Sequence, residues 1–396
     1  MPNRVNKQYL KILWWAMALS QFDSLASRAS GKRDAGKVLV VRLDGIGDFV
    51  LWLDAAAGLR TLYPAPHYRI TLLGNRLWTT VAQAQSMFDE VWEMDLKRFA
   101  YNPGYRFHLM RQVAEAGFSI AINPTFGRDF LWGDAIIRAS QAPQRIGIDG
   151  LLDRMSAAGR SLSNRWYTRL LSASQAQTEL ERNADFIRVL GSSSFECSLP
   201  KIKVKGTNHP TLVHRDYYVL APFAGYAIRR WPLDNFRRVA ELLFAETGWL
   251  GVVCGGSRDR EGAKKLVSAT NGTLLDYTGR VGLSETLAII AGSRLILGNE
   301  TGLTHLAAGA GTPFICILGG GHYGRFLPYP SQINYEGQRF RTVTQQMDCF
   351  GCNWRCVFER STKQPAPCIE KISVESVWQK TLSLVRSIRA SQSTTG

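Results

Sequence analysis

The sequence is poor in cysteine and has no long apolar run. It carries seven cysteines among 396 residues, which excludes a disulfide-stabilised scaffold. Its most apolar stretch, 9–19, is shorter than the roughly 20 residues that a bilayer-spanning helix needs. No secretory signal with a small-residue cleavage site is evident either. We therefore expect a protein of the reducing cytoplasm.

Acidic residues are also scarce relative to basic ones. The chain has 48 Lys and Arg against 32 Asp and Glu, a formal net charge of +16. This excess is spread along the chain, and no platform of aromatic and basic side chains is evident, so we expect no nucleic-acid partner. A basic surface suits phosphorylated substrates and anionic membrane faces. Hydrophobic residues make up 45% and charged residues 20%, which is typical of globular proteins.

The N-terminal segment is apolar and rich in tryptophan. Residues 9–19 read YLKILWWAMAL, and a polar tether follows. A helix of this kind can lie at a membrane interface, with its tryptophans at the headgroups, or pack on the protein's own body. Both alternatives stay open, and we assign 1–36 to this helix and its tether.

Short apolar strands alternate with helical stretches in two series, which is the pattern of parallel sheets covered by helices. The expected strands are 37–43, 68–73, 90–94 and 118–124 in the first series, and 217–222, 249–256, 293–299 and 313–319 in the second. Residues 141–215 look less regular. The sequence predicts two domains, 37–205 and 206–374, and then a helix and tail over 375–396. Because ligands bind at the carboxyl ends of strands in such folds, we expect a site between the domains.

The first strand ends in a turn that contains Asp44, Gly45, Gly47 and Asp48. The turn begins like a dinucleotide-binding fingerprint, but the third glycine is missing, so an NAD site is not expected. A carboxylate at a strand tip suits a general base. It equally suits the first turn of a helix, where Asp is favoured by the helix dipole. Both alternatives stay open for Asp48, whereas a structural role is favoured for Asp44.

The most specific group of candidate binding residues follows the expected strand 293–299. Thr301 and Gly302 would present free backbone N–H groups at a helix N-terminus, which is a ready anion site. Glu300, just before them, could accept hydrogen bonds from sugar hydroxyls. His305, one turn further on, is either a ligand contact or a satisfied histidine near the core, and the second alternative is favoured.

A loop of small residues follows the first strand of the second series. Ala224 and Gly225 lead to Arg229, which stands in the run Arg229-Arg230-Trp231-Pro232. A guanidinium after such a loop can clamp a diphosphate, because its fork of donors matches phosphate oxygens. The alternative is a surface loop with a proline that starts a helix.

Taken together, these motifs resemble glycosyltransferase family 9, the ADP-heptose:lipopolysaccharide heptosyltransferases, from about Lys37 to Val377. The run 42–60 is similar to the family's R-x-x-x-x-G-D opening, and 229–243 to its K-R-W-P-x-x-x-F-x-x-L motif. The run 283–319 is similar to acid-S/T-G-x-x-H-L-A-A-A-x-G-x-P. The resemblance implies an α/β GT-B fold, with two Rossmann-like doubly wound domains that face each other across a cleft.

The resemblance also implies an activity: inverting transfer of heptose from ADP-heptose onto a lipid-linked saccharide of the lipopolysaccharide or O-antigen type. The reaction would take place at the cytoplasmic face of the inner membrane. No cofactor would be required, because protein groups stabilise the diphosphate leaving group in place of a metal ion. In the family the Asp of the opening is the proposed base, which is Asp48 here.

The remaining site residues follow from the same resemblance. The acceptor turn would comprise Asp44, Gly45 and Gly47. The residues expected at the donor are Ala224, Gly225, Arg229, Glu285, Glu300, Thr301, Gly302, Leu303 and His305, of which Glu285 would hold the ribose. Two positions depart from the family pattern. Arg229 stands where Lys is usual, and Glu300, one methylene longer, stands where Asp is usual.

Four cysteines have the spacing of metal ligands: Cys349, Cys352, Cys356 and Cys368. Four thiolates suit tetrahedral zinc or iron in a structural site. Disulfides formed on oxidation and plain reduced thiols are the alternatives. The spacing resembles the cysteine motif of the bacterial autotransporter heptosyltransferases, where the resemblance implies a bound iron.

Two other functions stay open. The cysteine motif supports an autotransporter-type enzyme with a protein Ser or Thr as acceptor. A non-catalytic nucleotide-sugar-binding module is the second alternative, and the presence of Asp48 argues against it.

Overall fold

The structure is a computed structural model of the chain, and it describes residues 22–28, 31–150, 155–172, 174–205, 212, 215–331, 333, 339–358, 361 and 363–393. The apolar segment 9–19 lies outside these residues. Two compact units make up the chain. The first comprises Met1–Gly45, Ala55–Gln175 and Arg182–Glu196, and the second Ile46–Asp54, Ala176–Glu181 and Cys197–Gly396. None of the helices in the described ranges has the length and apolarity needed to cross a membrane.

Six parallel strands form the sheet of the first unit, in the order β3-β2-β1-β4-β5-β6. They are β1 (Asp34–Arg42), β2 (Arg69–Asn75), β3 (Glu90–Met94), β4 (Phe118–Ile122), β5 (Gln144–Asp149) and β6 (Arg169–Ser172). The central strand β1 is apolar on both of its faces, and Val38–Val41 are buried, because helices cover the sheet on both sides.

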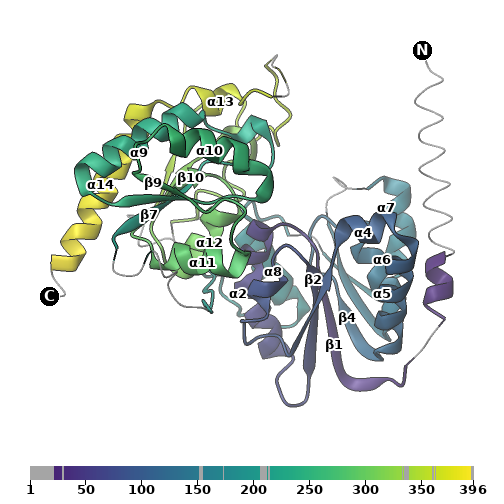
Figure 1. The fold of residues 1–396 in the computed structure, drawn as a ribbon. Helices are drawn as coiled ribbons and strands as arrows, with labels where there is room; N and C mark the ends of the chain where they lie inside the picture. The colour runs from purple at the N-terminus through teal and green to yellow at the C-terminus, as the bar shows by residue number, and fades with distance from the viewer. Residues whose placement is uncertain are drawn as a thin grey trace, which may run out of the picture. The chain divides into compact units, whose positions relative to one another are not determined.

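The helices of this unit lie on the two faces of its sheet (Figure 1). One face carries α4 (Leu96–Tyr101), α5 (Pro103–Glu115), α6 (Gly133–Ser140) and α7 (Ala157–Asn164), and the other carries α2 (Ile46–Leu62) and α8 (Glu179–Leu190), whose first residues belong to the second unit. The short α3 (Thr79–Ala82) follows β2. Asn102 caps α5 by accepting from the Tyr105 backbone N–H at 2.9 Å, and Pro103 stands where no donor is needed.

The second unit repeats this topology. Its parallel sheet has the order β12-β11-β10-β7-β8-β9. The strands are β7 (Tyr217–Ala221), β8 (Leu250–Val253), β9 (Leu274–Asp276), β10 (Ile296–Asn299), β11 (Phe314–Ile317) and β12 (Phe340–Val343). Counted within each unit, both sheets have the strand order 3-2-1-4-5-6, which is that of the Rossmann fold. The expectation of two Rossmann-like α/β domains is therefore confirmed.

Helices also cover both faces of the second sheet (Figure 1). On one face lie α9 (Leu233–Thr247), α10 (Arg260–Ser268) and α14 (Val374–Ser393), and on the other α11 (Leu283–Gly292) and α12 (Gly302–Ala310). The first group packs on β7, β10 and β11 through a core that includes Tyr218, Leu297, Ile315, Val239 and Leu384. The short α13 (Pro367–Glu370) and the 3-10 turns η2 (Ala227–Arg229), η3 (Ser257–Asp259) and η4 (Gly320–His322) complete the unit.

The amphipathic pattern of 178–190 predicts the helix α8 correctly, but sequence reasoning missed the other regular structure within 141–215. The strands β5 and β6 lie there, together with α7. A glycine interrupts the apolar pattern of β5, because a Cβ on Gly147 would lie 2.5 Å from the ring of Tyr167. β6 is only four residues long and stands at the edge of the sheet, so it carries too few apolar residues to be recognised.

Candidate active site

Each sheet reverses its strand order once, and this switch point is where open α/β folds bind ligands. The reversal falls between β1 and β4 in the first unit and between β7 and β10 in the second. Most of the predicted site residues follow the carboxyl ends of β1, β7 and β10. Their positions in the chain therefore match the place where the topology predicts a ligand.

The side chain of Asn299 joins the two strands at the switch point of the second unit. It is fully buried at the end of β10. Its Nδ2 donates to the carbonyl of Pro222, just after β7, at 2.7 Å, and its Oδ1 accepts from the Trp231 backbone N–H at 3.0 Å. Sequence reasoning gave Asn299 no role. A buried amide at the end of an apolar strand was the signal that could have found it.

Arg229 and Glu300 form an ion pair beside Asn299. Nη2 of Arg229 lies 3.1 Å from Oε2 of Glu300 and also donates to the Glu300 backbone carbonyl. The carboxylate is buried, which raises its pKa, while the Arg229 charge acts in the opposite direction. The ion pair is not aligned as a hydrogen bond, and Nε of Arg229 finds no acceptor among the described residues. The guanidinium therefore keeps donor capacity for a ligand anion.

The N-terminus of α12 has the geometry of an anion site. Thr301 is its N-cap residue, with extended backbone angles of φ −146° and ψ 175°, and no side chain caps the first turn. The Thr304 hydroxyl instead donates to the Asn299 carbonyl at 2.9 Å. The backbone N–H groups of Gly302 and Leu303 have no acceptor within the described ranges. Uncapped N–H groups and the helix dipole together favour a negative ligand.

His305 is buried one turn into α12. Its Nδ1 lies 2.8 Å from the hydroxyl of Tyr329. Burial, assisted by the charge of Arg229, lowers the pKa of His305 to about 3, so the ring is neutral at physiological pH. This geometry is that of a satisfied histidine near the core.

The other predicted donor residues differ in exposure. Glu285 is exposed in the first turn of α11. Since α11 runs into β10, its N-terminus lies at the same edge of the sheet as Glu300. Gly225 is exposed and Ala224 is buried. The carbonyl of Ala224 accepts from Nε of Arg230 at 2.7 Å, so the neighbouring arginine fixes this loop.

The start of α2 belongs to the second unit, together with α12. Asp48 is half-buried in the first turn of α2. Within this unit, a Cβ on Gly47 would lie 2.9 Å from Cδ2 of His305, and a Cβ on Gly302 would lie 2.6 Å from Cβ of Ile46. The two glycines therefore allow the starts of the two helices to approach closely.

Asp44 has a structural environment in the first unit. Its Oδ1 accepts from Nε of Arg42 at 2.9 Å, and both side chains are buried. The backbone carbonyl of Asp44 accepts from Nδ2 of Asn75 at 3.2 Å and from Nε1 of Trp78 at 2.9 Å. Gly45 then caps α2 without a side chain. These contacts fix the turn that leads to Asp48.

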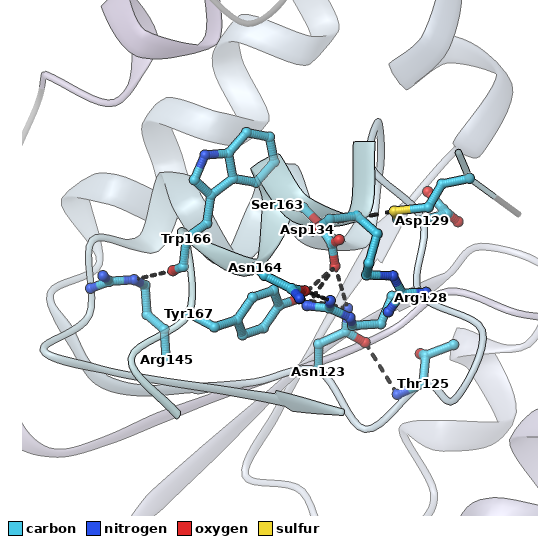
Figure 2. Close-up of polar contacts among 12 residues, drawn as sticks. Asn123, Thr125, Arg128, Asp129, Asp134, Arg145, Ser163, Asn164, Trp166 and Tyr167 are labelled. Atoms are coloured by element: carbon cyan, nitrogen blue, oxygen red, sulfur yellow. Dashed lines mark hydrogen bonds and ion pairs between the residues drawn. The ribbon is translucent and has the colours of Figure 1, made fainter. Parts of the chain in front are cut away.

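Figure 2 shows a buried polar network next to the carboxyl end of β4, which sequence reasoning missed. Asp134 accepts from the Tyr167 hydroxyl at 2.5 Å and from Nδ2 of Asn123 at 3.3 Å. The guanidinium of Arg128 is fully buried over the Tyr167 ring, and its Nη1 lies 3.9 Å from Asp134. Burial and the Asp134 carboxylate raise the pKa of Tyr167 well above its usual value. Asn123 also accepts from the Thr125 backbone N–H, so the network shapes the loop after β4.

The four clustered cysteines lie near one another. All are unpaired. Burial raises the pKa of Cys368, and the thiols of Cys349, Cys352 and Cys356 act in the same direction, while the Gly320 N–H donates to its sulfur at 3.4 Å. In the part of the chain that the structure describes, no three His, Cys, Asp or Glu side chains are arranged to hold a metal ion. Four thiolates are a donor set that suits zinc or iron.

Comparison with known proteins identifies relatives of the chain. Residues 131–353 match the model of glycosyltransferase family 9 (heptosyltransferase). The chain is 29% identical over 221 residues to lipopolysaccharide heptosyltransferase 1 of Pseudomonas aeruginosa, an alignment that covers 54% of this chain and 57% of that protein. The chain thus spans less than two thirds of the length of this curated relative.

Solved structures agree on the fold. The ADP-heptose lps heptosyltransferase II of E. coli superposes with a TM-score of 0.66 at 16% identity, covering 89% of this chain and 99% of that one. The iron-containing heptosyltransferase TibC superposes with a TM-score of 0.54 at 14% identity, covering 90% of this chain and 78% of that one. These likenesses are of fold, and the fold is GT-B.

The buried network in Figure 2 leads to a prediction about stability. Replacing Asp134 by Ala leaves the fully buried Arg128 guanidinium without its counter-charge. We expect the free energy of unfolding to fall by about 3–5 kcal/mol. Urea denaturation followed by circular dichroism measures this change.

The matched control is Glu115→Ala, which removes the acid of an exposed ion pair with Arg111 on α5. It should cost less than about 1 kcal/mol. If the two variants were equally stable, Asp134 would not be the counter-charge of a buried guanidinium.

Proposed function

The chain belongs to glycosyltransferase family 9, and from this premise we propose that it is an inverting glycosyltransferase with a nucleoside-diphosphate-sugar donor. One observation carries the proposal. The ion-paired Arg229 and the uncapped N-terminus of α12 both stand at the switch point of the second unit. Both features suit a diphosphate.

ADP-heptose is the first candidate for the donor. The E. coli structure similar to this chain is an ADP-heptose lps heptosyltransferase, and the curated relative is a lipopolysaccharide heptosyltransferase by name. We propose that Arg229, Thr301, Gly302 and Leu303 hold the diphosphate and that Glu285 accepts hydrogen bonds from the ribose. In this arrangement Glu300 would hold the guanidinium of Arg229, because its buried carboxylate lies against that guanidinium. Contact with the donor sugar would not be its only role.

The acceptor would be a saccharide of the lipopolysaccharide or O-antigen type. The net charge of +16 suits an anionic, lipid-linked substrate at the inner membrane. Asp48 would take the proton of the acceptor hydroxyl while that oxygen forms a bond to the anomeric carbon. The bond from the anomeric carbon to the diphosphate breaks in the same step, and Arg229 and the α12 N-terminus stabilise the charge that develops on the leaving group.

Replacing Asp48 by Asn tests this assignment. The variant keeps the shape of the first turn of α2 but cannot accept the proton. We expect the rate of ADP release from ADP-heptose, with a heptose-free lipopolysaccharide saccharide as acceptor, to fall by about 10²- to 10⁴-fold. Binding of ADP, measured by calorimetry, should stay unchanged.

Asp54→Asn is the control on the same helix. Asp54 lies beyond the first turn of α2, and its carboxylate accepts hydrogen bonds from Ser198. The control variant should keep normal turnover. Near-normal turnover of the Asp48 variant would show that the base is another group. Absence of turnover in the unmodified protein, with ADP binding intact, would favour a non-catalytic nucleotide-sugar-binding module.

The cysteine motif favours a second candidate, a protein O-heptosyltransferase of the autotransporter type. The likeness to TibC, which is iron-containing, agrees with this motif but extends only to the fold. The acceptor decides between the two candidates. Transfer of heptose to a Ser- or Thr-containing protein instead of a saccharide would establish the second.

We also propose that Cys349, Cys352, Cys356 and Cys368 hold one zinc or iron ion with a structural role. We expect about one equivalent of metal in protein purified without chelator, by inductively coupled plasma mass spectrometry, and its loss in Cys352→Ser. Four reactive thiols and no bound metal in the purified protein would contradict this proposal.

A further inference from the structure

The first three clustered cysteines lie in one loop, residues 349–356, which we call the cysteine loop. This loop is hydrogen-bonded to the turn after β11. The Gly351 N–H donates to the carbonyl of Gly320 at 2.8 Å, and the Asn353 N–H donates to that of Gly321 at 2.9 Å. Nε2 of His322 lies 2.7 Å from Oδ1 of Asn353. Because β11 is the neighbour of β10, this turn stands at the same sheet edge as Glu300. The cysteine loop therefore reaches the edge where the donor is proposed to bind.

Trp354 packs directly on the glycines of this turn. A Cβ built on Gly321 would lie 2.3 Å from the indole, and one built on Gly319 would lie 2.7 Å from it. No side chain fits at either position while the indole stays in place. The indole thus explains the glycines at positions 319 and 321, whereas a Cβ on Gly320 would lie 2.2 Å from the ring of Phe350.

The backbone under this ring adopts an unusual conformation. Asn353 has a φ of 50° and Trp354 a φ of 61°, in the left-handed region. A bulky residue rarely adopts this conformation. Such strained positions persist where the surroundings enforce them, and they cluster at functional sites.

The indole of Trp354 lies next to Arg229. The guanidinium carbon is 5.7 Å from the ring centroid, within the range of a cation–π interaction. Arg229 also forms an ion pair with the buried carboxylate of Glu300. The guanidinium thereby contacts both an aromatic ring and a carboxylate, while its Nε has no acceptor in the described structure.

We propose that Trp354 is a positioning residue that holds the Arg229 guanidinium for the donor diphosphate. The cysteine loop then contributes to the donor site as well as to the stability of the fold. This inference rests on the proposed function of Arg229. The new element is Trp354, a residue of the cysteine loop that acts through Arg229.

The test compares ADP binding by calorimetry in variants of Trp354. Trp354→Leu removes the aromatic face, and we expect it to raise the Kd for ADP by about three- to tenfold. Trp354→Phe keeps an aromatic face and should restore most of the affinity. Trp378→Leu is the matched control, because Trp378 is also a half-buried tryptophan on the core of the second unit. It should leave the Kd unchanged.

The same substitutions in an Arg229→Met background separate positioning from a general structural role. If Trp354 acts through Arg229, Trp354→Leu causes no further loss of ADP affinity once the guanidinium is gone. An equal loss in both backgrounds, or the same Kd for the Leu variants of Trp354 and Trp378, would overturn the inference. If Trp354→Leu does not fold, Trp354→Met takes its place in both backgrounds, and it must lose affinity only in the presence of Arg229.

The proposed function fails in a different way. If the unmodified protein binds neither ADP nor ADP-heptose, the assignment of the donor site falls, and the role of Trp354 falls with it. If ADP binds normally and only the comparison of tryptophan variants fails, the donor site stands and the positioning role alone is wrong.

Discussion

The second unit depends on a single buried amide. Asn299 stands where the strand order reverses, and it bonds both to the end of β7 and to the backbone of Trp231. A buried amide of this kind is costly unless its donors and acceptors are paired, so its partners are fixed in place. The partner Trp231 follows Arg229 by two residues, and Asn299 itself leads into the N-terminus of α12. The spacing between a guanidinium and a set of free backbone N–H groups follows from this one side chain.

The electrostatics of the site follow from the same arrangement. A diphosphate leaving group needs positive charge that is already in place, because reorganising it during the reaction would cost free energy. In the proposed site, Arg229 would supply a full positive charge and the N-terminus of α12 a partial one. The buried Glu300 carboxylate lies 3.1 Å from the guanidinium, and the Arg229 charge opposes the rise in the pKa of Glu300 that burial causes. Arg229 is the centre of this cluster, and the indole of Trp354 borders it.

Much of the fold could be predicted from the alternation of short apolar strands and helices. The central strands β1, β4, β7 and β10 are buried on both faces, so their sequences are nearly continuous apolar runs. Edge strands such as β6 and β9 are short and carry few such residues, and they were missed. The positions of the motif residues at strand ends were also predictable, because the parallel topology fixes which end of a strand meets the ligand.

Contacts between distant residues could not be read from the sequence in the same way. Asp134 meets Tyr167 across 33 residues, and Trp354 meets Arg229 across 125, and no local pattern marks either pair. The environment of His305 likewise depends on Tyr329, which comes from a later loop. The sequence also contains the four clustered cysteines, but the spacing of cysteines does not determine the distances between their sulfur atoms. These features depend on tertiary packing, and the structure is needed to find them.

The central claim is that the second unit binds a nucleoside-diphosphate sugar through Arg229 and the α12 N-terminus. The most direct test is a calorimetric titration of the purified protein with ADP, ADP-heptose, UDP-glucose and GDP-mannose. We predict saturable binding that is strongest for ADP and ADP-heptose and that is weaker, but still measurable, in Arg229→Met. Preference for another nucleotide sugar would keep the diphosphate site and change the donor. Binding of none of the four, or binding that does not depend on Arg229, would contradict the account.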